Sequence, residues 1–211
     1  MAGPSGTTPI YGFPFPTPDD TVDVPRDVQA LAMSLDGMSS LRPPLVTSLP
    51  ASPIDGQEVY YLADNTNGIV WHLRYRSASA STSKWEAPGA TPLFAEQIPN
   101  TQFGGSTYGL VGPSLVAPLA GDYIVRQGAT ISSAAAAVWR GRISYIGVDA
   151  DSAEYNGQGA AAGSSSGGSV ERTMRRTLVA GTTYTIGARS DTGATVNFER
   201  RWLSLQPVRV G

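Results

Sequence analysis

The chain has 211 residues and a net charge of -2 at pH 7, and 41% of its residues are hydrophobic. This composition allows one or two small domains with a packed core, and the charge gives no general attraction to nucleic acid or to an anionic membrane. With no cysteine and a single histidine, the chain lacks the usual residues of most metal sites and most nucleophile–base pairs. We therefore expect a structural or binding protein with no metal and no cofactor, and not an enzyme.

Turn-forming residues are frequent, with 24 glycines and 16 prolines, which favours a turn-rich β architecture. No apolar run reaches the roughly 18 residues of a membrane-spanning helix. The first five residues also lack the basic and then apolar order of a signal peptide. We expect a protein that is made in a cytoplasm and is not inserted into a membrane.

Residues 1–24 form a proline-rich arm that carries the aromatic residues Tyr11, Phe13 and Phe15. Proline fixes φ and keeps the preceding residue out of the helical region, so this arm is expected to be extended and unable to form a core of its own. One interpretation is a flexible tail. The other is an anchor whose three rings dock on a partner chain, because a solvated tail seldom carries so many large rings.

Residues 25–44 are predicted to hold one short helix and a linker. Asp23 or Thr21 can cap this helix, and Pro25 suits its first turn. The apolar residues at helical spacing are Val24, Val28, Leu31, Leu35 and Met38. A helix of about a dozen residues is not stable alone in water, so this stripe must pack on the rest of the chain or against copies of itself. We take the middle three residues of the stripe as a candidate oligomer interface.

Residues 45–89 are predicted to form a small β-meander. Two alternating runs, 57–63 and 69–75, flank a turn at 64–68 whose asparagines and glycine supply the left-handed positions of a hairpin. A third short strand is predicted at 84–86.

The two faces of the run 69–75 differ in character. One face carries Ile69, Trp71, Leu73 and Tyr75, and the other, solvated face carries Val70, His72, Arg74 and Arg76. His72 would have to be the base of any serine hydrolase, but its arginine neighbours would oppose an imidazolium and supply no carboxylate to orient the ring. We interpret His72 as a structural residue.

The aromatic residues Trp71, Tyr75 and Trp85 admit two interpretations. Flat rings suit the CH faces of sugars, so the three could form a sugar-stacking platform. An aromatic cluster in a module of about fifty residues is more often its core, and we favour that interpretation.

Residues 90–105 are expected to be a linker, and residues 106–211 a domain of antiparallel strands. The predicted strands are 121–131, 134–148, 170–179, 183–190, 194–198 and 202–210. Several short strands with turn residues between them and no second helix favour a β-sandwich of the jelly-roll type. The predicted fold is thus mainly β, with an extended arm, one short helix, a small β-meander and a C-terminal antiparallel β-sandwich.

Charged residues in this domain form two patterns. Arginines alternate at Arg140 and Arg142 and again at Arg172 and Arg176, and we interpret them as solvated faces or subunit contacts rather than an anion channel. The segment 149–154 holds three carboxylates that could bind calcium, but it lacks the glycine and the remaining ligands of a calcium-loop pattern.

Residues 149–169 are expected to be the longest loop of the domain. The glycines of this segment have a phosphate-loop-like spacing, but no apolar strand feeds the loop and no helix follows it. Its residues suited to stack on or hydrogen-bond a sugar are Tyr155, Asn156 and Gln158, which makes it a candidate contact loop. The competing interpretation is a solvated spacer rich in glycine and serine.

Three parts of the chain carry a resemblance to a known family: residues 11–20 with 28–32, the run 48–61, and the closing segment 201–210. They look like minor tail or fibre-type proteins of tailed phages that infect actinobacteria. These motifs recur in differing virion proteins. The strand start at 121–123 and the terminal strand are also similar to trimeric jelly rolls of the tumour-necrosis-factor type.

The resemblance implies a non-enzymatic virion protein, assembled in the host cytoplasm, that is attached by its N-terminal part and displays a β-domain as a homotrimer. The arm aromatics would anchor it to other virion proteins, and a host cell-surface glycan is a possible further partner, with the loop 149–169 as the candidate contact. A capsid decoration or head-fibre protein is the alternative, because an anchor plus an exposed sandwich would serve a capsid equally well. An enzyme acting on cell-wall glycan comes third, since no acid pair suited to glycoside hydrolysis is evident.

Overall fold

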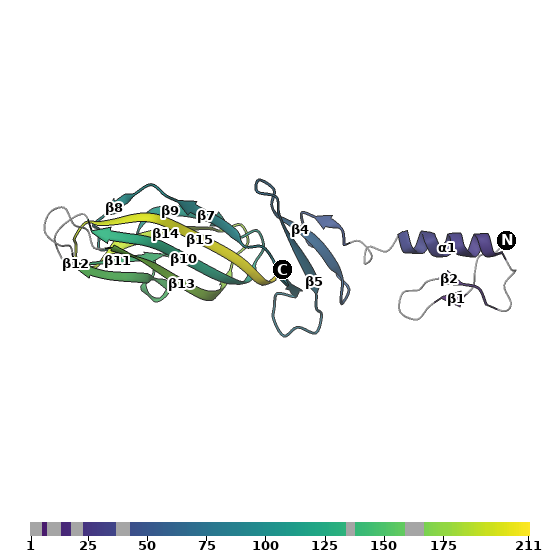
Figure 1. Cartoon of the computed structure of the whole chain (residues 1–211). Coiled ribbons are helices and arrows are strands. Elements are labelled where there is room, and N and C mark those ends of the chain that lie inside the picture. The colour runs from purple at the N-terminus through teal and green to yellow at the C-terminus, as the bar shows by residue number, and fades with distance from the viewer. Residues whose placement is uncertain (1–5, 8–13, 18–22, 37–42, 134–137, 159–166) are drawn as a thin grey trace.

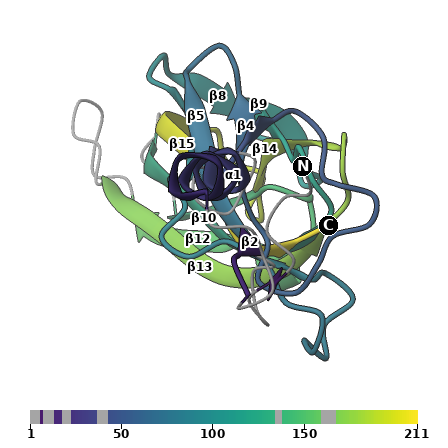
Figure 2. The same cartoon turned by 90° about the vertical axis from the view of Figure 1, so that its right-hand side faces the viewer.

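The computed structural model describes residues 6–7, 14–17, 23–36, 43–133, 138–158 and 167–211. Figure 1 shows a β-sandwich at one end, a small β-sheet beside it, and a helix with a two-stranded ribbon at the other end. In the end-on view of Figure 2 the helix lies in front of the sheets. The predicted class, mainly β with a sandwich of the jelly-roll type, is confirmed.

The N-terminal elements are short. They are β1 (Gly6–Thr7), β2 (Pro14–Phe15), α1 (Val24–Asp36), β3 (Leu45–Val46), β4 (Glu58–Asp64), β5 (Ile69–Tyr75) and β6 (Trp85–Glu86). The C-terminal elements are β7 (Leu93–Gln97), β8 (Thr101–Phe103), β9 (Gly109–Val116), β10 (Gly121–Ser133), β11 (Val138–Ser144), the 3-10 turn η1 (Asp149–Asp151), β12 (Ala153–Gln158), β13 (Gly167–Leu178), β14 (Thr183–Ser190) and β15 (Val196–Val210).

The sandwich consists of two antiparallel sheets. One sheet has the order β7, β15, β10, β13, and β8 pairs with the first residues of β15; the other has the order β9, β14, β11, β12. From β9 onward each connection passes from one sheet to the other, except the one between β11 and β12. This winding is that of a jelly roll.

The core lies between the two sheets, because side chains alternate along each strand and one face of each sheet points inward. Its fully buried members include Tyr123, Ile131, Trp139, Ile143, Ile186, Phe198, Leu203 and Leu205. At Gly141 of β11 the sheets approach closely, since a Cβ there would lie 2.8 Å from Ile131 and 3.0 Å from Val196 of the facing sheet. A glycine is needed at this position for the two layers to meet.

Several predicted boundaries need correction. Residues 90–105 were expected to be a linker, but they contain β7 and β8, both paired with β15. The segments 194–198 and 202–210 form a single strand, β15. Of the predicted strand 134–148, the structure describes the part Val138–Ser144 as β11, while residues 134–137 lie outside the described part of the chain.

Arg201 explains how β15 passes through its irregular middle. Two residues of β15 oppose one residue of β10 between Phe198 and Arg201, which is a β-bulge. The Arg201 side chain is fully buried, and its guanidinium donates to the carbonyl oxygens of Phe198, Glu199 (2.7 Å) and Pro99 (2.9 Å). These bonds supply donors to backbone carbonyls at the bulge, where β7 ends before β8 begins. Burial lowers the pKa of Arg201.

The small sheet is continuous with the sandwich. The predicted hairpin of β4 and β5 is confirmed, and β6 pairs with β5 on one side and with the end of β15 on the other, where Trp85 faces Val210. Trp71 lies at the junction: its ring contacts that of Tyr123 in the sandwich, and its Nε1 donates to Thr91 O at 2.8 Å. One hydrophobic core therefore runs from the small sheet into the jelly roll.

Candidate functional site

The arm contributes one described aromatic residue to the proposed anchor. Phe15 lies in β2, is 43% exposed, and has its ring over Gly6 of β1. Tyr11 and Phe13 lie outside the described residues. Because β1 and β2 pair with each other, the described part of the arm forms a small ribbon rather than a purely extended chain.

Helix α1 begins as the sequence predicts, with Asp23 as its cap. The Asp23 Oδ1 accepts a hydrogen bond from the backbone N of Arg26 at 3.2 Å. The helix packs beside β2. Its half-buried residues include Asp27, Ala30 and Ser34. These residues are polar or small, and by helical spacing they lie on a different side of the helix from the apolar stripe.

The apolar stripe of α1 is open to solvent. Val24, Val28, Leu31 and Leu35 are 63%, 60%, 38% and 36% exposed. The structure therefore does not place the candidate oligomer contacts against the jelly roll. Of the two options that the sequence left open, packing on the rest of the chain is not seen among the described residues. Association with another chain remains a prediction.

The predicted contact loop is different in the structure. Residues 153–158 form the strand β12, and β13 already begins at Gly167, so residues 149–169 are not one continuous loop. The Tyr155 ring is half-buried and packs on Trp139 with ring centroids 5.5 Å apart. Asn156 is exposed, but its Oδ1 accepts from Arg140 Nε at 2.6 Å. The Gln158 side chain lies outside the described part of the chain. The loop interpretation missed β12 because its partner β11 lies across a turn that composition alone does not reveal.

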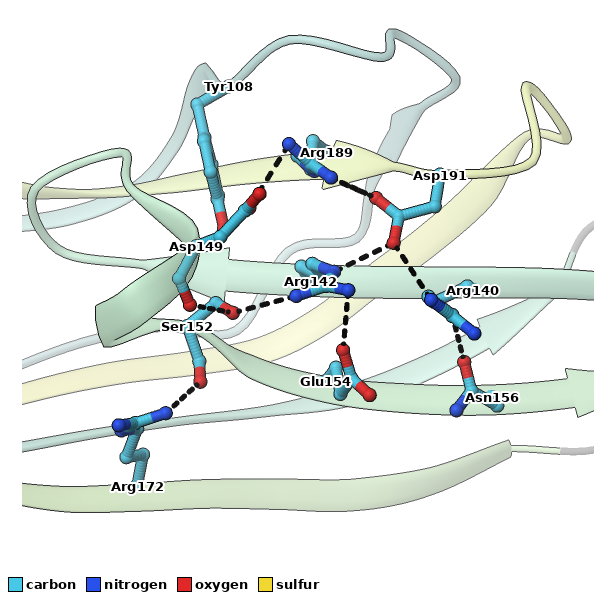
Figure 3. Close-up of polar contacts among 10 residues, drawn as sticks. All are labelled: Tyr108, Arg140, Arg142, Asp149, Ser152, Glu154, Asn156, Arg172, Arg189 and Asp191. Atoms are coloured by element: carbon cyan, nitrogen blue, oxygen red, sulfur yellow. Dashed lines mark hydrogen bonds and ion pairs between the residues drawn. The ribbon is translucent and has the colours of Figure 1, made fainter.

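A network of arginines and carboxylates covers the outer face of the sheet β14–β11–β12 (Figure 3). Arg142 lies at its centre and pairs with Asp191 (2.7 Å) and Glu154 (2.9 Å). Arg189 joins Asp191 (2.7 Å) to Asp149 (3.1 Å). The partners come from adjacent strands, because Arg142 lies directly opposite Glu154 on one side and Arg189 on the other.

The charges of this network neutralise one another. Burial alone would raise the pKa of Asp191, but hydrogen bonds from Arg142 and Arg189 outweigh it and hold the pKa below its usual range. Tyr108 donates to Asp149 (3.4 Å) and lies under the Arg189 guanidinium at 5.6 Å, and burial is the main cause that raises its pKa. Arg142 and Arg189 are engaged by carboxylates, so the network stabilises the sheet and leaves neither arginine free to bind an anion.

The three carboxylates of residues 149–154 are each paired with an arginine in the structure. Asp149 pairs with Arg189, Asp151 with Arg176, and Glu154 with Arg142. No cluster of metal-ligating side chains is found among the residues that the structure describes.

His72 has a partner that the sequence analysis did not foresee. Its Nε2 lies 3.1 Å from Glu58 Oε2, and its ring is 5.4 Å from that of Tyr60. The expectation that no carboxylate lies near His72 is therefore wrong, because it considered only neighbours on the same strand and not those on β4. No described hydroxyl group hydrogen-bonds the ring, so a hydrolase arrangement is not formed there.

The aromatic cluster of the small sheet is core rather than a platform. Trp71 is 0% and Trp85 3% exposed, and the Tyr75 and Trp85 rings meet edge to face at 5.3 Å. An exposed aromatic pair lies elsewhere, on the outer face of the sheet β7–β15–β10–β13. It consists of Phe94, 53% exposed, and the half-buried Trp202, with near-parallel rings 6.3 Å apart.

Sequence analysis missed this exposed pair, although one signal was present. Gly128 lies inside the predicted strand 121–131, and a glycine inside a strand often marks a close approach by another group. Here that group is the Trp202 indole, which lies within 2.5 Å of where a Gly128 Cβ would stand.

No protein-family model and no curated protein matches this chain. Among solved structures, the chain is similar to the Eiger TNF protein from S. frugiperda. The two share 11% identity over 57% of this chain and 93% of that protein, with a TM-score of 0.34. A score this low carries no argument about function or assembly. The helix of the described residues is too short to cross a membrane.

Proposed function

We propose that this chain is a non-enzymatic structural protein of a phage virion, located in the tail or tail tip. It is attached through its N-terminal part, displays the jelly roll outward and forms a homotrimer. The proposal joins the resemblance of the sequence to minor tail and fibre-type proteins with one feature of the structure, the exposed apolar stripe of α1.

The stripe supports attachment through the N-terminal part. A helix of 13 residues is marginal in water unless its apolar face is covered. The ribbon β1–β2 lies beside the helix, yet Val24, Val28, Leu31 and Leu35 still expose much of their side chains. Burying such a side chain is worth on the order of 1–2 kcal/mol, and three helices around an axis would bury the stripe of each.

The rest of the chain suits display. The jelly roll and the small sheet share one core, joined through β6, so they are expected to move as one unit. The helix and its ribbon lie at the far end from the sandwich (Figure 1). An attachment element at one end and a self-contained β-domain at the other is the arrangement that a particle appendage needs.

A cryo-EM reconstruction of particles that carry this chain tests the location. Density for the jelly roll on the tail, with α1 at the particle side, is the expected result. Density on the capsid would assign the alternative of a decoration or head-fibre protein, and absence of the chain from purified particles would overturn both. Light scattering of the full chain should give about three times the 22.1 kDa subunit mass.

A further inference from the structure

Four residues form a row across the outer face of the sheet β7–β15–β10–β13. Glu96 of β7 lies opposite Trp202 of β15, Trp202 opposite Gly128 of β10, and Gly128 opposite Glu171 of β13. Residues in register on neighbouring strands point to the same face, and here that face is turned away from the core. Since Gly128 has no side chain, the row has a gap at its centre.

The Trp202 indole fills the bottom of this gap. A Cβ at Gly128 would stand 2.4–2.5 Å from the ring atoms Cε2, Cζ2 and Nε1, so the indole rests on the backbone of β10. The Trp202 side chain is half-buried, and the Phe94 ring, which is 53% exposed, lies near-parallel to it with the ring centroids 6.3 Å apart. The two rings together form a partly exposed aromatic surface on this face of the sheet.

Polar groups surround this aromatic surface in an open groove of about 560 Å³. The hydroxyls of Thr130 and Ser169 lie 3.4 Å apart at one side, and Arg200 is paired with Glu96 at the other. Glu171 also lines the groove, and its carboxylate forms no ion pair with any described residue. The volume falls in the range of about 300–1,000 Å³ that is usual for small-molecule sites.

We propose that this groove binds a neutral pyranoside of an oligosaccharide, with a sugar ring stacked on Trp202. The CH face of a pyranose packs on an accessible indole, and carboxylates accept hydrogen bonds from sugar hydroxyls, as the Glu171 and Glu96 side chains are placed to do. Arg200 and the two hydroxyls can donate to ring and hydroxyl oxygens. Two carboxylates against one guanidinium leave a net negative charge, which disfavours anionic sugars.

The inference rests on the proposed function only for the source of the sugar, a host cell-surface glycan. Affinity of a single groove is expected to be weak, with a Kd of about 1 mM, and several copies on one particle would strengthen attachment by effective concentration.

Tryptophan fluorescence gives a direct test with the full chain. Trp71, Trp85 and Trp139 are at most 3% exposed, so acrylamide quenching reports chiefly on Trp202. The probes are neutral trisaccharides of glucose, mannose and galactose, with a uronic acid trisaccharide as the anionic comparison. At least one neutral probe should protect Trp202 from acrylamide, and the anionic probe should not.

Variants that keep Trp202 locate the binding. Glu171→Gln should weaken binding about tenfold and Phe94→Ala about threefold. Thr173→Ala is the matched control for Glu171→Gln, because Thr173 lies on the same strand and the same face as Glu171 but does not line the groove. This variant should bind the sugar as tightly as the unchanged chain does. Trp202→Ala, followed by ligand-observed NMR, should lose detectable binding.

Two results would overturn the inference. One is the absence of protection by every neutral probe up to about 50 mM, a concentration at which sites even tenfold weaker than expected would be substantially filled. The other is protection of Trp202 that grows with protein concentration alone and is lost in Phe94→Ala, which would assign this face to contact between copies of the chain. Neither result depends on particles, so failure here leaves the virion proposal standing, and a chain that binds sugar but is absent from particles would overturn the virion proposal alone.

Discussion

The jelly roll and helix α1 use apolar side chains in opposite ways. In the jelly roll, Phe198, Trp139 and Ile143 are fully buried between two sheets. In α1, the residues Val24 and Val28 remain at least 60% exposed although they form a regular stripe. The difference indicates that the jelly roll is stable by its own contacts, whereas the stripe of α1 finds no covering surface among the residues that the structure describes.

The largest expected effect on stability is that of a substitution in the core of the jelly roll. Phe198→Ala should lower the free energy of unfolding by about 3–5 kcal/mol, because it removes a large ring and leaves a cavity between the sheets. Urea denaturation followed by circular dichroism measures it. Leu31→Ala in the stripe is the counterpart and should change the value for a monomeric sample by less than about 0.5 kcal/mol. Similar losses in both variants would refute the distinction between the two regions.

Two adjacent arginines sharpen the comparison inside the jelly roll. Arg201→Met should cost about 2–4 kcal/mol of stability, since it removes the donor of three backbone carbonyls, the buried one of Phe198 and the part-buried ones of Glu199 and Pro99. Arg200→Met removes an exposed partner of Glu96 and should have a much smaller effect. Urea denaturation of both variants measures this difference in stability. An Arg201→Met protein as stable as the unchanged chain would show that the bulge does not need the guanidinium.

The arginine network predicts a dependence on pH. The pKa of Asp191 is lowered in the folded protein, so its contribution is present above the unfolded pKa of about 4 and is lost as pH falls through the lower folded value. Asp191→Asn should cost about 1–2 kcal/mol at pH 7. Its melting temperature should also fall less steeply than that of the unchanged chain between about pH 5 and pH 3.

The control for this network is Asp122→Asn. Arg175, the partner of Asp122, is largely exposed. Loss of this ion pair should therefore change the stability at pH 7 and the pH dependence of the melting temperature less than Asp191→Asn does. Parallel pH profiles for the Asp191→Asn variant and the unchanged chain would contradict the role given to Asp191.

Substitutions in the apolar stripe of α1 are expected to have the smallest effect on stability. Their effect on association of the chain should be large. The triple change of Val28, Leu31 and Leu35 to serine should leave the melting temperature of the jelly roll unaltered and reduce the mass found by light scattering. Met33→Ser is the matched control, because Met33 is 67% exposed on the opposite face of the helix. An unchanged mass in the triple variant would place any association elsewhere in the chain.

Local patterns were enough to predict some of the strands. The strand β14 covers the predicted residues 183–190, and the hairpin of β4 and β5 falls within one residue of its predicted bounds. In both cases the alternation of side chains and a flanking glycine with positive φ, Gly181 or Gly68, carry the information within a few residues.

Elements that depend on distant partners were not predictable in this way. The strand β9 contains Gly112 and Pro113, which read locally as a turn, yet it pairs with β14 about seventy residues later in the chain. The predicted sugar-contact residue Tyr155 is held against Trp139 because β12 pairs with β11. The groove at Trp202 brings together strands from four parts of the chain, and only the register of the sheet reveals it.

The attachment claim is tested most directly by particle incorporation of a chain that lacks residues 1–42. The shortened protein keeps β3 to β15, so its melting temperature should match that of the full chain, which confirms that the jelly roll is folded. The account predicts that it is absent from purified particles when it is the only copy supplied, whereas the full chain is incorporated. Incorporation of the folded, shortened chain at the normal level would contradict attachment through the N-terminal part.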